Sequence, residues 1–574
     1  MSLNPTKKTP VRTFVPAEID FADWSQLQPL FDQLAGRELG SRADLERWLL
    51  DLSELYAAID EFGSRRYIAK TCHTEDEAIK EAFMHFVEHI EPKLKPVMFE
   101  MKKKFAACPH KDELTDAKYE ILKRQWETDV EIYREENVPL QTTETKLITE
   151  YDEYIGAMMV EFRGKERTLP QMGKFLEETD RATREEAWTL TAERRLKDRQ
   201  KLDTIFDELL KLRQQIAENA GFADYRAYTF KALHRFDYTP EDCHAFAEAV
   251  EAEVVPMIRE LDAQRRSELK LDALRPWDLG VDLKGREPLQ PFDENDIDGF
   301  VAKTREIFHR LSPALAAEFD ELKHAGNLDL DSRRGKAPGG YQAGLPETGV
   351  PFIFMNAAGL QRDVETLLHE GGHAFHFMAS KAEPVVFLRH APMEFCEVAS
   401  MAMELLALPH MDVFFADEAG QARAKRHQLE GATILAWIAT IDQFQHWLYT
   451  NPGHSSEARR AKWLEIFDRF GHDVDYTGHE DAKEWLWQRQ LHLYHVPFYY
   501  IEYGIAQLGA LQLWLKSLQD PHQALANYRN GLKFGGTRSL PELFTATGLQ
   551  FDFSRKTVGP LAKAVRQELA ALPA

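Results

Sequence analysis

Apolar residues recur every three or four positions along most of the chain, which is the spacing of one face of an α-helix. The stretch KLDTIFDELLKLRQQIAENAG, residues 201–221, shows this spacing until Asn219, Ala220 and Gly221 supply a C-terminal stop. The same spacing predicts further helices over residues 41–61, 77–106, 113–135, 240–271 and 421–450. The pattern therefore predicts a mostly α protein.

Two segments break the helical spacing and predict small β elements. Residues 158–168, MMVEFRGKERT, are short, β-branched and aromatic around Arg163-Gly164-Lys165, which predicts a hairpin. Residues 328–359 carry glycine and proline turns between short extended stretches, and VPFIF within them predicts a strand. This second element comes directly before a histidine-rich segment.

Length, charge and cysteine usage narrow the class of protein. The chain has 574 residues, and we expect an N-terminal helical lobe over residues 1–200 and a second region over residues 201–574. A formal net charge of −23 argues against nucleic acid as a partner. The four cysteines form no CxxC pair, no apolar run is long enough for a membrane span, and the N-terminus lacks a secretory signal. These features predict a soluble cytoplasmic protein without a membrane partner.

The segment TLLHEGGHAFHF, residues 366–377, contains the pattern H-E-x-x-H. His369 and His373 stand one turn apart on a predicted helix, so two imidazoles can bind one metal ion. Glu370 lies at the rim of that face, where its carboxylate can accept a proton from a water on the metal. Gly371 and Gly372 leave room for a close approach, which either a substrate or a tightly packed helix can use.

The next predicted helix, MEFCEVASMAMELLALP over residues 393–409, supplies a third ligand. Glu397 and Glu404 are seven residues apart, share one face and lie among apolar side chains, where carboxylates need partners. Glu397 as a metal ligand and Glu404 as the hydrogen-bond partner of a ligand imidazole satisfy both. Glu394 is predicted to face solvent. Two histidines and one carboxylate leave a fourth position open, which is typical of a catalytic zinc site with one ion per chain.

On these residues the chain resembles the thimet oligopeptidase and oligoendopeptidase F family of zinc metallopeptidases, and it looks most similar to the bacterial oligoendopeptidases. The similarity rests on HEGGHAFH, on EVASMAME placed 24 residues beyond His373, on GGYQ and PETGVPFIFMN before them, and on HLYHVPFYYIEYGIA after them. It implies His369, His373 and Glu397 as zinc ligands and Glu370 as general base. It also implies two helical lobes around a deep central channel that admits only short oligopeptides.

The segment RQLHLYHVPFYYIEYG, residues 489–504, crowds histidines and tyrosines together. Phenol and imidazole groups can donate hydrogen bonds to the oxyanion of peptide hydrolysis. Tyr500 and Tyr503 share a helix face and resemble the family's transition-state tyrosines, and His492 resembles its substrate-binding histidine, with His495 as a rival. The strand VPFIFMN offers backbone groups that can pair with an extended peptide. The predicted substrate-binding residues are Gly339, Gly340, Tyr341, Phe352, Phe354, His495 and Tyr499.

The sequence therefore predicts a zinc-dependent endopeptidase in which Glu370 moves a proton from water to the leaving amine, without a covalent intermediate. Two alternatives stay open. A helical zinc carboxypeptidase can carry the same H-E-x-x-H pattern, and a non-catalytic helical binding protein can retain a degenerate site. An endopeptidase cuts a peptide that is blocked at both ends, whereas a carboxypeptidase does not. A zinc content of about one ion per chain with chelator-sensitive hydrolysis excludes the binding protein.

Overall fold

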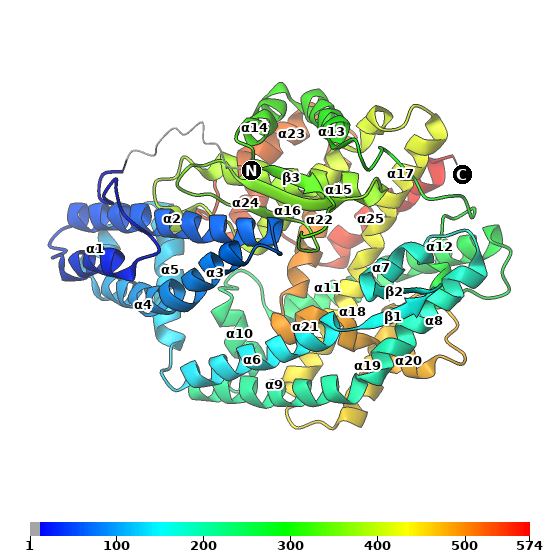
Figure 1. The fold of residues 1–574 in the computed structure, drawn as a ribbon, viewed down its shortest axis with the longest axis horizontal. Helices are drawn as coiled ribbons and strands as arrows, with labels where there is room; N and C mark the ends of the chain where they lie inside the picture. The colour runs from blue at the N-terminus through cyan, green and yellow to red at the C-terminus, as the bar shows by residue number, and fades with distance from the viewer. Residues whose placement is uncertain (1–11, 574) are drawn as a thin grey trace.

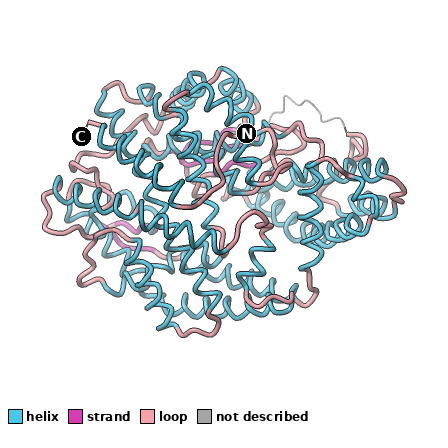
Figure 2. The backbone as a smooth tube through the Cα atoms, turned by 180° about the vertical axis from the view of Figure 1, so that it is seen from behind, coloured by secondary structure: helices cyan, strands magenta, loops and turns pink. Residues whose placement is uncertain are grey.

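The computed structural model describes residues 12–573, and it is almost wholly helical (Figure 1). Figure 2 shows the strands as two small, separate patches in a backbone that is otherwise mostly helix and loop. The predicted mostly α fold is confirmed. Within the described residues, no helix combines the length and the apolar character that a membrane crossing needs.

Five N-terminal helices lie at one end of the molecule, drawn in blue in Figure 1, and all but the third supply side chains to a separate core. Capping residues begin four of them: the side chains of Asp23, Ser41, Asp76 and Asp116 each accept a hydrogen bond from the first helical turn. Val385 and Leu388, which follow the histidine-rich helix, complete this core. The helices are α1 (Trp24–Gly36), α2 (Arg42–Cys72), α3 (Glu77–His85), α4 (Glu91–Ala107) and α5 (Ala117–Ile132).

A long run of helices follows, interrupted by the predicted hairpin. Strands β1 (Met159–Phe162) and β2 (Lys165–Thr168) pair antiparallel, and Arg163 and Gly164 between them both have positive φ. Two positive φ angles suit the tight turn of a right-twisted hairpin, so this prediction is confirmed. The helices are α6 (Asn137–Gly156), α7 (Leu169–Met172), α8 (Arg181–Lys197), α9 (Arg199–Asn219), α10 (Tyr225–Ala232), α11 (Pro240–Glu253), α12 (Val255–Glu268), α13 (Ile297–Leu311) and α14 (Pro313–His324). The boundary predicted near residue 200 falls at the junction of α8 and α9.

A three-stranded sheet lies beside the histidine-rich helix α15 (Gln361–Ser380). Its order is β3 (Leu328–Asp331), β5 (Phe352–Ala357) and β4 (Tyr341–Ala343), with β5 parallel to β3 and antiparallel to β4. The predicted strand is confirmed as β5, but the expectation that its backbone groups pair with an extended peptide is wrong. Because β3 and β4 occupy both its edges, the free edge beside α15 belongs to β4.

Helix α16 (Met393–Leu406) lies between α15 and α22 (Tyr500–Ser517). A Cβ added at Gly372 of α15 would lie 2.5 Å from the carbonyl oxygen of Ala399, and one added at Gly509 of α22 would lie 2.7 Å from Val398. Gly371 faces the ring of Phe308 at 2.8 Å in the same way. Of the two uses left open for the HEGGH glycines, the structure shows close helix packing.

We expect Gly372→Ala to weaken metal binding and to lower the free energy of unfolding by about 1–3 kcal/mol, because the added methyl group pushes α15 away from α16. Zinc titration and urea unfolding measure the two effects. Gly431→Ala is a matched control, since nothing lies within 4 Å of the added Cβ and the backbone there is helical. Unchanged zinc affinity in Gly372→Ala would show that the helix spacing does not set the position of the α16 side chains.

The remaining helices complete the C-terminal part of the core. They are α17 (Glu418–Glu430), α18 (Ile434–Thr450), α19 (Ser456–Phe470), α20 (Glu480–Glu484), α21 (Leu491–His495), α23 (Pro521–Leu532), α24 (Leu540–Ala546) and α25 (Arg555–Ala571).

Candidate metal centre and substrate site

Helix α15 places the two histidines of HEGGH one turn apart, facing α16. The centroids of the His369 and His373 rings lie 4.9 Å apart. Oε2 of Glu397, on α16, lies 3.4 Å from Nε2 of His369 and 3.7 Å from Nε2 of His373. One ligand atom from each of the three side chains lies within 4.8 Å of the others. The structure therefore brings together the three residues that the sequence predicts as metal ligands.

The chemistry of these donors fits a zinc ion. Two imidazole nitrogens and one carboxylate oxygen form a ligand set that zinc takes in catalytic sites. Glu370, Glu397 and Glu404 all lie near enough to His369 to influence its pKa. Across residues 12–573, none of these three carboxylates forms an ion pair with a lysine or an arginine. A bound dication would offset this concentration of negative charge.

Hydrogen bonds from outside the ligand set orient His369 and Glu397. Nδ1 of His369 donates to Oε1 of Glu404 at 2.7 Å, and Nε2 is the ring nitrogen that faces Glu397. Nε2 of Gln428 donates to the second oxygen of Glu404 at 2.7 Å. The hydroxyl of Ser400 donates to Oε2 of Glu397 at 3.0 Å. Burial lowers the pKa of His369, but the hydrogen bond and charge of Glu404 outweigh it and raise that pKa to about 9.

We expect Glu404→Ala to weaken zinc affinity by about ten- to a hundredfold, because His369 loses the acceptor that fixes its ring and tautomer. Competition with a chelator of known affinity measures the change. Glu404→Gln keeps one acceptor oxygen at this position, so it should lose less. Equal losses in the two variants would mean that the negative charge, and not the hydrogen bond, is what His369 needs.

Glu370 lies buried beside the ligand group, with 7% of its surface exposed. Burial raises the pKa of its carboxyl to about 7, while the charge of His369 lowers it and that of Glu397 raises it. The backbone of Gln342, on the edge strand β4, also lowers it. A carboxyl group with a pKa near neutrality can both accept and return a proton, as a general base must.

The structure fixes the tautomer of His492, on α21. The indole Nε1–H of Trp437 donates to Oε1 of Gln490 at 3.0 Å, so the amide nitrogen of Gln490 faces Nδ1 of His492 at 2.7 Å. Nδ1 must then accept a hydrogen bond, and Nε2 carries the proton of the neutral ring. Burial lowers the pKa of His492 to about 4, so the ring is neutral near pH 7. His492 is therefore built to donate one hydrogen bond through Nε2.

Tyr500 and Tyr503, the two predicted oxyanion donors, have different neighbours. Burial and, next, the negative charge of Glu397 raise the pKa of Tyr503 to about 12. Burial, Tyr503 and Glu397 raise the pKa of Tyr499. The pKa of Tyr500 responds to burial and to Trp437, Arg489 and Gln490, and not to Glu397. Of the two predicted oxyanion donors, Tyr503 is thus influenced by the ligand group, while the hydroxyl of Tyr500 lies near Trp437 and Gln490.

The predicted substrate-binding residues lie in different places. The ring of Tyr341 stacks on that of Phe354 at 4.9 Å, and Phe352 and Phe354 are buried in a small core, so these two side chains do not face a peptide. Gly340 lies against Thr366 of α15. The ring of His492 lies 5.9 Å from that of Tyr503, whereas Nε2 of His495 lies 2.8 Å from Oδ1 of Asp152 on α6. The structure therefore separates the two rival histidines, and it places His492 with the tyrosines.

The predicted exposure of Glu394 is wrong, because the residue is 4% exposed. Its Oε1 accepts a hydrogen bond from the hydroxyl of Tyr238 at 2.7 Å. Arg235, also buried, pairs with Glu502 at 2.8 Å and lies close enough for Glu394 to raise its pKa. Helical spacing alone could not reveal the buried cation that makes this burial tolerable.

A second group of possible ligand atoms lies elsewhere: Cys243, Asp442 and His446 also come within 4.8 Å of one another. All three are buried, whereas His369 and His373 are only half-buried. A catalytic metal needs an open position for water or substrate. The group around Glu397 therefore fits the catalytic role, and the Cys243 group does not.

Two protein-family models match most of the chain. Residues 174–558 match the model of peptidase family M3, and residues 14–133 match the peptidase M3 N-terminal domain. The oligopeptidase PepF of Bacillus subtilis (strain 168) is 24% identical over 294 residues, which are 50% of this chain and 42% of that protein. The aligned part thus spans less than half the length of this relative.

Solved structures match over nearly the whole chain. PZ peptidase A, solved with an inhibitor, superposes with a TM-score of 0.88 at 27% identity and covers 96% of this chain and 98% of its own. An oligoendopeptidase F gives 0.88 at 28% identity, covering 98% and 99%. An oligoendopeptidase F from Bacillus anthracis gives 0.84 at 26% identity, again covering 98% and 99%.

Proposed function

The chain belongs to peptidase family M3, and on that basis we propose that it is a zinc-dependent endopeptidase that hydrolyses internal bonds of short peptides. The observation that carries the proposal is the placement of His369, His373 and Glu397 within 4.8 Å of one another, beside the buried carboxyl group of Glu370. The names of the similar proteins, oligopeptidase and oligoendopeptidase, support the same substrate class.

His369, His373 and Glu397 would hold the zinc ion, which would act as a Lewis acid and lower the pKa of a water molecule to near neutrality. Glu370 accepts a proton from the attacking water and delivers it to the nitrogen of the leaving amine. Tyr503 and the Nε2–H of His492 donate hydrogen bonds to the oxyanion that develops on the scissile carbonyl. Because Glu370 works on water, no residue of the chain becomes acylated.

The free edge of β4 supplies the alignment of the peptide. Gly340 and Tyr341 lie on or beside this strand, and the backbone of Gln342 faces Glu370. An extended peptide that adds to this edge would pair its backbone with β4 and pass in front of Glu370. Next to the strand, Gly339 has open space where its side chain would be, with nothing within 4 Å of an added Cβ.

The test is hydrolysis of a mixed-length peptide library whose members are blocked at both ends, with the zinc content of the protein measured in parallel. An endopeptidase cleaves these peptides with about one zinc per chain and stops when a chelator is added. Release of C-terminal residues from unblocked peptides alone would indicate the carboxypeptidase alternative. Protein without zinc and without cleavage would indicate a binding protein.

We place this activity in the cytoplasm. Cys72, Cys108, Cys243 and Cys396 are all buried and free, which suits a reducing compartment.

A further inference from the structure

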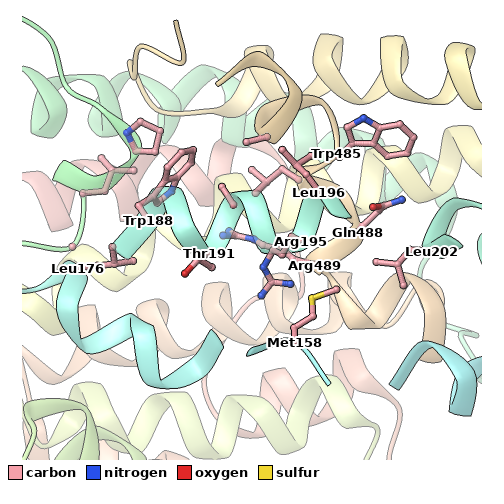
Figure 3. Close-up of a pocket in the computed structure, with 16 residues that line it drawn as sticks. Met158, Leu176, Trp188, Thr191, Arg195, Leu196, Leu202, Trp485, Gln488 and Arg489 are labelled. Carbon is pink, nitrogen blue, oxygen red and sulfur yellow. The ribbon is translucent and has the colours of Figure 1, made fainter. Parts of the chain in front are cut away.

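A recess of about 280 Å³ lies outside the ligand group, between α8, the segment Pro276–Gly280 and the segment Ala482–Arg489. Its walls are mostly apolar, with Trp188, Leu196 and Trp485 among them (Figure 3). Two arginines, Arg195 of α8 and Arg489, also line it, and Figure 3 shows their guanidinium groups close together in its centre. The recess thus joins an apolar wall to two adjacent positive charges.

Neither of these arginines has a carboxylate partner within residues 12–573. Other arginines of the same elements are paired: Arg194 with Asp198 at 2.5 Å, and both Arg181 and Arg184 with Asp278 at 2.8 and 3.1 Å. In a chain with a net charge of −23, two neighbouring arginines without a carboxylate partner are out of keeping with their surroundings.

The electrostatics of the recess favour an anion. Desolvation lowers the pKa of both arginines, and the charge of Arg489 lowers the pKa of Arg195 further. Arg489 also lies over the ring of Trp437, 5.0 Å from its centroid, which orients the guanidinium group. An anion between the two groups would remove their repulsion and accept several charge-assisted hydrogen bonds. Arg489 is exposed and Arg195 half-buried, so a ligand can reach both.

Side-chain contacts link the recess to the candidate substrate site. Arg489 is followed by Gln490, which bonds both Trp437 and His492. Arg489 also lowers the pKa of Tyr500, whose ring lies 5.5 Å from that of Tyr503. A chain of contacting side chains therefore links the arginines to Tyr503, whose pKa Glu397 raises.

We infer that the recess binds the C-terminal residue of a peptide substrate, with the terminal carboxylate on Arg195 and Arg489 and an apolar side chain against Trp188 and Trp485. The inference rests on the proposed peptidase function. A free anion such as phosphate also carries negative charge, but it has no apolar group to pack against the walls of the recess. The expected substrates are peptides that end in an apolar residue with a free carboxylate.

The test compares two N-terminally blocked peptides of the same sequence, one ending in a carboxylate and one in a carboxamide. The wild-type protein should cleave the carboxylate peptide with a kcat/KM about ten- to a hundredfold higher. In the double variant Arg195→Gln/Arg489→Gln the ratio should fall to about one, and Arg489→Lys should keep part of it. Arg194→Gln, whose arginine pairs with Asp198 outside the recess, should keep the full ratio.

Equal cleavage of the two peptides by the wild-type protein, or an undiminished ratio in the double variant, would overturn the inference. If neither peptide is cleaved, the proposed function fails instead. Binding then tests the recess separately: calorimetry on the Glu370→Gln protein should show tighter binding of the carboxylate peptide, and the double variant should lose that difference. Phosphate or acetate added as a competitor should displace the carboxylate peptide, because both anions bind the two arginines, and should displace the carboxamide peptide much less. Equal displacement of the two peptides would contradict the inference and would indicate a site for free anions.

Discussion

Glu370→Gln is expected to slow peptide hydrolysis by at least about a hundred- to a thousandfold while the protein keeps its zinc. The reason is that glutamine fills the same buried volume but cannot accept a proton from water. Glu370 lies outside the ligand group of His369, His373 and Glu397, so the metal has no need of its charge. Steady-state kcat and KM, together with zinc analysis of the purified protein, measure the two outcomes.

Glu365→Gln is the matched control, because Glu365 stands five residues earlier on α15 and bonds His427 at 2.8 Å, outside the ligand group. It should keep near wild-type activity. Two results would contradict the role of Glu370 as general base. One is retained activity of the Glu370→Gln protein. The other is a loss of activity that follows a loss of zinc, since this would make Glu370 a ligand.

The ligand group could be predicted because its geometry is local. His369 and His373 are one turn apart on a single helix, and Glu397 stands in the next helix among apolar residues where a carboxylate needs a partner. The hairpin at Arg163-Gly164 was predictable for the same reason, since its turn depends on two adjacent residues.

Features that depend on distant segments could not be predicted. The burial of Glu394 depends on Tyr238 and Arg235, which arrive from another part of the chain. Strand β5 has no free edge because β3 pairs with it on one side and β4 on the other. The local spacing of apolar residues does not indicate which distant segments will pair with Glu394 or with β5.

The amides that orient the site were missed for a related reason. Gln428 bonds Glu404, and Gln490 bonds His492 and Trp437, yet a glutamine in a helical segment is most often a solvated residue. A possible signal is that Gln490 directly precedes the histidine and tyrosine cluster. Only the three-dimensional contacts distinguish an orienting amide from a surface one.

The directions of the two tyrosines lead to the second large prediction. We expect Tyr503→Phe to lower kcat by about a hundred- to a thousandfold, because a donor to the developing oxyanion is lost. Tyr500→Phe should lose much less, since its hydroxyl faces Trp437, Gln490 and Arg489 and not the ligand group. An interaction made only in the transition state lowers kcat and kcat/KM equally, so KM should change little in Tyr503→Phe.

The pair of variants makes this prediction specific, because both remove one hydroxyl from the same aromatic cluster. Tyr500 is 9% exposed and Tyr503 is half-buried, so a general loosening of the cluster would affect Tyr500→Phe at least as strongly. A larger loss in Tyr500→Phe would therefore assign the oxyanion donor to Tyr500, against the geometry. Equal, modest losses in both would leave the Nε2–H of His492 as the donor, because its proton is fixed by Gln490 independently of either tyrosine.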